Sequence, residues 1–154
     1  MDLPLPTERN VDTWQVYLWN LPEDVLSRAQ KLQFMLMLEG EFNAFDPYLV
    51  VGDLLQHRDG WRGAVMDRGY LHPDDATQPP AHLRTDLIKL RDIQAHWNVD
   101  TLFILTDPSN TDRLQALAEN WVADEIGVVE EPAVSALLGA YGGHSSQIVT
   151  VWWD

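Results

Sequence analysis

The chain has 154 residues, no cysteine and a formal net charge of −14. Its length is typical of one domain, and the lack of cysteine excludes disulfides, thiolate metal sites and cysteine nucleophiles. The charge argues against a general nucleic-acid-binding surface, because contacts with phosphates need a cationic face.

The N-terminus and the apolar runs predict a soluble protein. Residues 1–8 show no basic segment followed by a long apolar stretch, so we expect no signal peptide. The longest apolar runs, such as Phe34–Leu38, are far shorter than the roughly 20 residues of a membrane helix. We therefore expect no membrane partner and a cytoplasmic location. The acidity is typical of a soluble surface, or of a protein whose partner is basic.

The N-terminal half predicts a short lead-in followed by a strand and a helix. Residues 1–11 are rich in proline and predict an extended lead-in, which leaves 12–154 as a single α/β domain. Asp12–Asn20 alternates apolar and polar side chains, which favours a strand. A helix is predicted over 22–38, with Asn20 as its cap and a proline in its first turn.

A hairpin, a loop and a second helix are predicted next. Residues 48–56 and 61–71 are typical of two strands, and the Asp-Gly pair between them is a turn signal. The proline-rich residues 72–80 predict a loop. Apolar residues at helical spacing predict a helix over 81–97.

Strands and helices alternate in the C-terminal part. The continuous apolar run Val99–Thr106 predicts a strand in the middle of a sheet. Helices are predicted at 110–121 and 132–138, and further strands at 125–129 and 147–153.

The complete order is β-α-β-β-α-β-α-β-α-β. Alternation of strands and helices is typical of parallel strands joined by right-handed crossovers, and the early hairpin makes the sheet mixed. The sequence therefore predicts an α/β fold with a mixed sheet that is flanked by helices and is parallel in its C-terminal half.

Carboxylates follow two of the predicted parallel strands. Asp107 comes directly after 99–106, and Glu130 and Glu131 come after 125–129. Ligands of open parallel sheets bind beyond the carboxyl ends of the strands, so these side chains are candidates for acid/base catalysis or for a Mg²⁺ site, above all Asp107. The alternative is helix capping, because Asp107 and Glu131 each precede a proline.

The segment Gly142-Gly-His-Ser-Ser lacks the spacing of a phosphate-binding loop or of a nucleophile elbow. It precedes the last strand, so in a parallel sheet it lies at the opposite edge from Asp107. We therefore expect no triad of Asp107, His144 and Ser145. The histidines also show no zinc-binding spacing.

Trp152 and Trp153 are adjacent in the last strand, where successive side chains point to opposite faces. If this strand lies at a sheet edge, a second copy can pair with it and cover the exposed ring, so Trp152 and Trp153 are predicted interface residues of a homodimer. The alternative is an internal strand whose two rings are both covered by helices.

Two functional hypotheses remain. The first is a non-enzymatic interaction domain that binds a basic protein partner and needs no cofactor. The second is a small metal-dependent or acid/base hydrolase that uses Asp107 with Glu130 or Glu131 and takes Mg²⁺. The sequence favours the first, because it shows no compact catalytic motif, although catalytic groups also converge from distant positions.

Overall fold

The computed structural model describes residues 4–40, 43–67, 93–97, 99–139 and 145–154. The described α-helices are α1 (Val11–Asn20), α2 (Arg28–Leu38), α3 (Pro47–Gln56), α5 (Thr111–Ala118) and α6 (Ala133–Leu137). Short 3₁₀ turns lie at η1 (Arg58–Gly60), η3 (Pro108–Asn110) and η4 (Glu119–Trp121). The strands are β1 (Gly63–Asp67), β2 (Thr101–Thr106), β3 (Glu125–Val129) and β4 (Gln147–Trp152).

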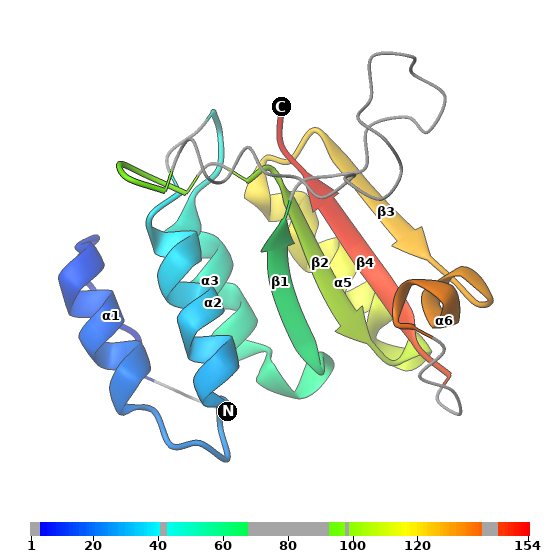
Figure 1. Cartoon of the computed structure of the whole chain (residues 1–154), viewed down its shortest axis with the longest axis horizontal. Helices are drawn as coiled ribbons and strands as arrows, with labels where there is room; N and C mark the ends of the chain where they lie inside the picture. The colour runs from blue at the N-terminus through cyan, green and yellow to red at the C-terminus, as the bar shows by residue number, and fades with distance from the viewer. Residues whose placement is uncertain (1–3, 41–42, 68–92, 98, 140–144) are drawn as a thin grey trace.

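The strands form one four-stranded sheet in the order β1-β2-β4-β3. All three neighbouring pairs are antiparallel. In Figure 1, α5 lies behind this sheet, α2 stands beside β1, and α1 is the outermost helix. The predicted parallel C-terminal half and the ten-element order are therefore wrong, although the mixture of helices with a sheet is confirmed.

The position of β4 explains the error in strand direction. β2 and β3 both run antiparallel to β4, so they run in the same direction as each other. The helix α5 joins them, as the alternation of strand and helix predicts. However, β4 reverses direction and occupies the space between them, and hydrophobic patterning does not specify which strands become neighbours.

The predicted strand at Asp12–Asn20 is the helix α1. Asn10 caps it, because the Asn10 side chain accepts a hydrogen bond from the Thr13 N–H at 2.9 Å. The helix buries Trp14 and Leu18, which lie four residues apart on one face. Val16, which completes the apparent alternation, is 62% exposed.

The first predicted hairpin strand, at 48–56, is the helix α3. Asp46 accepts a hydrogen bond from the Leu49 N–H at 3.2 Å, and Pro47 occupies the first turn. The helix buries Val50 and Leu54 completely. The expected hairpin therefore does not exist, and β1 pairs with β2 instead.

The C-terminal elements match their predictions closely. The expected strands at 99–106, 125–129 and 147–153 are β2, β3 and β4, and the expected helices at 110–121 and 132–138 correspond to α5 with η4 and to α6. The helix expected over 22–38 begins only at Arg28, because Ser27 caps it by accepting from the Gln30 N–H at 3.2 Å. The predicted loop at 72–80 and residues 81–92 of the next predicted helix lie outside the described residues.

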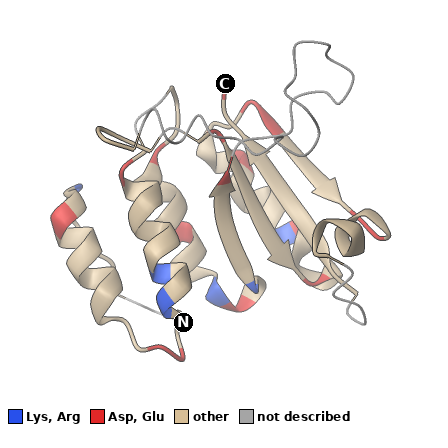
Figure 2. Ribbon diagram, viewed as in Figure 1, with Lys and Arg blue, Asp and Glu red and all other residues tan. Residues whose placement is uncertain are grey.

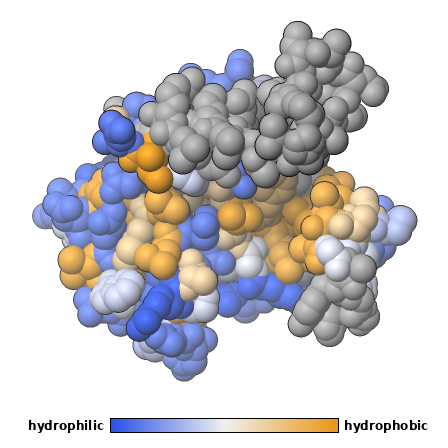
Figure 3. All heavy atoms as spheres, viewed as in Figure 1, coloured by the Kyte–Doolittle hydropathy of each residue, from blue (hydrophilic) through white to orange (hydrophobic). Residues whose placement is uncertain are grey.

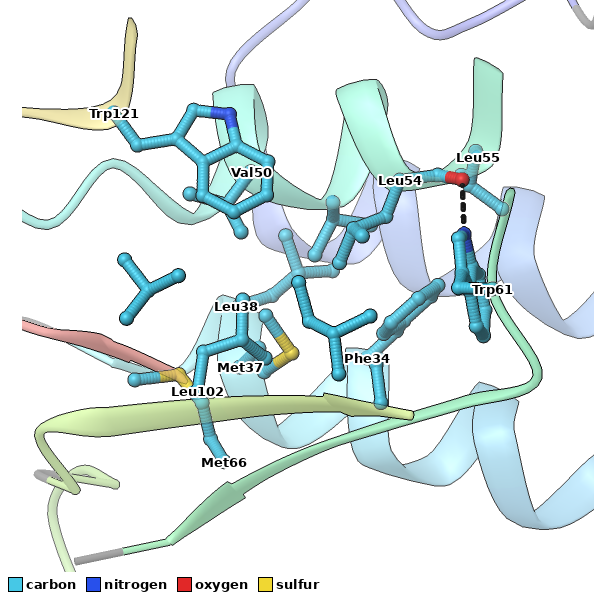
Figure 4. Close-up of a cluster of buried hydrophobic side chains, with 14 of the residues drawn as sticks. Phe34, Met37, Leu38, Val50, Leu54, Leu55, Trp61, Met66, Leu102 and Trp121 are labelled. Carbon is cyan, nitrogen blue, oxygen red and sulfur yellow. Dashed lines mark hydrogen bonds between the residues drawn. The ribbon is translucent and has the colours of Figure 1, made fainter. Parts of the chain in front are cut away.

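One face of the sheet packs against the helices and forms the core. Leu102, Ile104, Val149 and Val151 have no exposed surface on this face. Figure 4 shows side chains from α2, α3, β1, β2 and η4 meeting in this cluster, where the Trp61 indole N–H donates to the Leu54 carbonyl at 2.8 Å. Among the described residues, no helix has the length and hydropathy needed to span a membrane.

Candidate functional site

The strand β3 forms one outer edge of the sheet. Its inner side pairs with β4, from Glu125 opposite Trp152 to Val129 opposite Ile148. Because β3 ends the strand order, its other side faces away from the sheet.

The hydrogen-bonding phase of β4 determines which backbone groups of β3 face outward. The Trp153 N–H donates to the Asp100 carbonyl at 3.0 Å, and the register places these two residues opposite each other at the end of the β2–β4 pair. Residues along an antiparallel pair alternate between hydrogen-bonded and non-hydrogen-bonded positions. The odd-numbered residues of β4 therefore bond to β2, and the even-numbered residues bond to β3.

Ile126 and Val128 consequently present their backbone N–H and C=O groups at the open edge. The even-numbered residues of β4 oppose the odd-numbered residues of β3, as Thr150 opposes Gly127. These odd-numbered residues direct their backbone groups inward, so the residues between them direct theirs outward. Within the described part of the chain, no hydrogen bond to these outward groups of Ile126 and Val128 is present.

Four exposed carboxylates flank β3, and we call them the acidic edge: Asp124, Glu125, Glu130 and Glu131. Three of them accept hydrogen bonds from uncharged donors, namely the Asp154 backbone N–H on Asp124 (2.8 Å), the Gln147 side-chain amide on Glu130 (2.9 Å) and the Ser135 backbone N–H on Glu131 (3.2 Å). These donors orient the carboxylates without neutralising them.

The acidic edge lies in a part of the chain that has no lysine or arginine. The last basic residue of this kind is Arg113, and residues 114–154 contain none. Among the described residues, no ion pair involves any carboxylate of the acidic edge. The cations of the described residues therefore leave the local negative charge uncompensated.

The described lysines and arginines lie on other elements, as Figure 2 shows. Four of them pair with carboxylates: Arg9 with Asp46 (2.8 Å), Arg28 with Glu23 (3.8 Å), Arg113 with Asp59 (3.2 Å) and Arg62 with Asp107. Lys31 and Arg58 instead donate to backbone carbonyls. The cations thus compensate negative charge or cap backbone groups away from β3.

Asp107 occupies the N-cap position of η3, but its side chain forms an ion pair and no capping hydrogen bond. Its carboxylate accepts from the Arg62 guanidinium, and no side-chain capping bond to η3 is present. Arg62 also donates to the Ser146 hydroxyl at 3.2 Å. The position expected of a cap is therefore confirmed, but the side chain does not cap and instead joins the start of β1 to the end of β2.

The structure brings two of the three predicted carboxylates to the same end of the sheet. Thr106, which precedes Asp107, opposes Gln147, and the Gln147 side chain donates to Glu130. The first residue of β4 therefore lies between Asp107 and Glu130. Glu131 is turned toward α6 and accepts from the Ser135 backbone N–H at 3.2 Å, although Pro132, and not Glu131, occupies the N-cap position of that helix. In the described ranges, no group of three or more acidic or histidine side chains is arranged to hold a metal ion.

The start of β4 lies at the same end of the sheet as Asp107, because β4 is antiparallel to β2. For Ser145 and Ser146, the described residues of the Gly142-Gly-His-Ser-Ser segment, the expected position at the opposite edge is therefore wrong. Ser145 is exposed and Ser146 is buried, while His144 lies outside the described residues.

The two predicted interface residues occupy an interior strand. Trp153 is fully buried, its indole N–H donates to the Trp121 carbonyl at 3.1 Å, and its ring meets Phe45 edge to face at 4.9 Å. Trp152 lies on the opposite face and is partly exposed. Because both sides of β4 are paired, the predicted position of this strand at a sheet edge is wrong, and a second copy has no free strand to pair with there.

Two other polar or concave features are present on the described surface. Hydrogen bonding from Arg113 lowers the pKa of the Asp59 carboxyl, and the same guanidinium lies 2.9 Å from Nδ1 of His57. A pocket of about 200 Å³ lies between residues 5–9 and α3. This volume is smaller than the roughly 300–1,000 Å³ of usual small-molecule sites, so the pocket is a weaker candidate site than the acidic edge. The carboxylate of Asp59 is already paired with Arg113, unlike those of the acidic edge.

The acidic edge is not predicted from the sequence, although one signal for it was present. The residues flanking the 125–129 strand are acidic at both ends, and no lysine or arginine follows Arg113. What the sequence does not show is that this strand ends the sheet. Comparison with models of known protein families, with curated proteins and with solved structures found no match to this chain.

Proposed function

We propose that the chain is a non-enzymatic interaction domain that binds a basic protein partner through the acidic edge. The observation that supports this function is a set of four exposed carboxylates around an open strand, with no cation paired to any of them among the described residues. A partner that supplies lysine or arginine side chains gains attraction there without having to displace an existing ion pair. The absence of cysteine suits a partner in the cytoplasm.

The arrangement of the candidate catalytic carboxylates favours binding over hydrolysis. An acid/base pair or a Mg²⁺ site needs oxygens that converge on one reacting group or ion. Asp107 instead meets Arg62, and Glu131 meets the backbone of α6. Asp107 and Glu131 therefore each have a structural partner that directs them away from a shared centre, and the Gln147 side-chain amide occupies Glu130.

The expected binding is modest and depends on salt. An exposed ion pair contributes about 0–1 kcal/mol, so the four carboxylates alone do not give tight association. Electrostatic complementarity acts mainly on the association rate and on the choice of partner. We therefore expect affinity to fall as screening by salt increases.

A labelled peptide with a Val-Thr-Val centre flanked by paired lysines tests this function by fluorescence anisotropy. We expect it to bind the protein at low salt, and we expect a matched peptide flanked by paired glutamates not to bind. The variant with Asp124→Asn, Glu125→Gln, Glu130→Gln and Glu131→Gln retains acceptor oxygens for the bonds described above. It should lose most of the affinity for the lysine peptide.

A second four-site variant controls for net charge. Glu8→Gln, Asp12→Asn, Glu23→Gln and Asp24→Asn remove the same number of exposed charges from the N-terminal elements. At about 0.15 M salt, where the screening length is about 8 Å, this control should bind the lysine peptide within about twofold of the unmodified protein, because α1 and its flanking residues lie on the other side of the molecule from β3. Equal losses in the two variants would show that the attraction is a property of net charge and not of the acidic edge.

A further inference from the structure

We propose that the basic partner binds as an extended segment that adds a strand to the open side of β3, an inference that rests on the proposed function. The segment has basic side chains at both ends and apolar side chains between them. Strand addition depends on the backbone groups of β3, which electrostatic attraction to the acidic edge does not require.

The two outer strands of the sheet differ in how their backbone groups are satisfied. At β1, the Gln30 side chain of α2 donates to the Ala64 carbonyl at 2.6 Å and accepts from the Ala64 N–H at 2.9 Å. This amide takes the place of a neighbouring strand. The corresponding outward groups of Ile126 and Val128 have no such partner within the described residues.

An added strand can satisfy both residues at once. Residues two apart along a strand direct their backbone groups to the same side and lie about 6.6–6.8 Å apart. Ile126 and Val128 have this spacing, so a segment of extended chain can bond to both. Main-chain hydrogen bonds supply affinity in strand addition, and side chains supply specificity.

The residues around β3 define the side chains that such a segment needs. Asp124 and Glu125 lie at the start of β3, and Glu130 and Glu131 follow its end, so lysine or arginine fits at both ends of the segment. Between them β3 is apolar, with Gly127 at its centre. Figure 3 shows hydrophobic surface on α6, the helix that follows β3, where Leu137 is 66% exposed. The middle of the segment is therefore apolar.

Charge disfavours a second copy of this chain as the added strand. Antiparallel pairing of β3 with itself about Gly127 would place the carboxylates at each end of one strand against those of the other copy. Like charges opposite each other destabilise a strand pair. A basic segment has the complementary charge, so it is the occupant that the edge favours.

Replacement of Val128 by proline tests the strand addition. Proline is tolerated in an edge strand where its N–H would face solvent, so Val128→Pro should keep the fold, and its melting curve checks this. It removes one outward donor and adds a ring at the edge. We expect the lysine-flanked peptide to bind it about tenfold more weakly. Val128→Ala, which loses the same side chain but keeps the N–H, should bind within about twofold.

Hydrogen exchange of the unmodified protein gives a second measurement that needs no variant. Binding of the lysine-flanked peptide should slow exchange of the Ile126 and Val128 amides. The Gly127 amide, which already bonds to β4, should change little. Unchanged exchange at Ile126 and Val128 would overturn the strand addition.

The outcomes separate this inference from the proposed function. If the peptide requires the acidic edge but binds Val128→Pro and Val128→Ala equally, the interaction domain stands and the added strand is refuted. If the peptide does not bind the unmodified protein at all, the proposed function is overturned, and the strand addition that rests on it is overturned with it. A wild-type dimer that Val128→Pro converts to a monomer in sedimentation would show that a second copy occupies the edge, which also overturns the assignment.

Discussion

Trp153 has a role in the core that its neighbour Trp152 does not share. The Trp153 ring is fully buried against Phe45, and its N–H donates to the Trp121 carbonyl. A buried indole therefore contributes both apolar area and a satisfied polar group. Trp152 points to the opposite, partly exposed face of the same strand.

We predict that Trp153→Ala destabilises the protein by about 3–5 kcal/mol, because it leaves a large cavity and an unsatisfied carbonyl. Trp152→Ala should cost only about 1–2 kcal/mol, since less area is removed from water in the native state. Urea unfolding followed by far-ultraviolet circular dichroism measures both. Equal costs for the two variants would contradict the interior placement of Trp153.

Two single residues, both helix caps, explain why the strands predicted at 12–20 and 48–56 are helices. Asn10 and Asp46 are helix caps, and both types are preferred at that position. The apolar alternation at 14, 16 and 18 favours a strand after Asn10, and the valines at 50 and 51 favour a strand after Asp46. In both cases burial selects a helical spacing, such as Trp14 with Leu18, that a short apolar run does not distinguish from a strand.

At the scale of elements, the α2–β1 contact protects one edge of the sheet. An exposed strand edge invites pairing with other chains, and Gln30 occupies the outward groups of Ala64 with both atoms of its amide. This contact joins a helix and a strand that are separated by α3 and η1 along the chain. No local sequence signal reveals such a long-range side-chain-to-backbone bond.

We predict that Gln30→Ala destabilises the protein by about 1–2 kcal/mol, because two backbone groups of Ala64 lose their partner. Exchange of the Ala64 amide, measured by NMR, should become faster in this variant. Gln30→Glu is a close control, since a carboxylate accepts from the Ala64 N–H but cannot donate to its carbonyl. Its Ala64 amide should remain more protected than in Gln30→Ala. Unchanged exchange in both variants would refute the edge contact.

Element order explains how far the fold was predictable. The strands at 101–106, 125–129 and 147–152 and the helix between the first two follow directly from their apolar patterns. The patterns do not specify the neighbours of each strand. The helical crossover from β2 to β3 therefore predicts a parallel pair. The insertion of β4 between them produced the all-antiparallel sheet and made β3 an edge, which is the property on which the candidate site depends.

For the molecule as a whole, charge is distributed unevenly along the fold. The cations of the described residues lie on the N-terminal elements, on the turns that lead into β1, and on α5, while β3, β4 and α6 have none. Compensated and uncompensated regions therefore coexist in one domain. The net charge of −14 means that repulsion among carboxylates outweighs attraction overall, and such an imbalance destabilises a compact state.

We therefore predict that sodium chloride raises the melting temperature between about 20 and 500 mM, since screening weakens this repulsion. The increase should be smaller in the variant that neutralises Asp124, Glu125, Glu130 and Glu131, because no cation of the described residues pairs with those carboxylates, so salt screens only their repulsion. The matched N-terminal variant should keep more of the salt response. In the unmodified protein Glu23 lies 3.8 Å from Arg28, so salt weakens the attraction of Glu23 as well as its repulsion. Removal of Glu23 therefore changes the salt response less. Calorimetry of the three proteins measures the effect. A melting temperature that falls with salt would contradict this prediction, because it would show that the attraction within pairs such as Arg62 with Asp107 outweighs the repulsion among carboxylates.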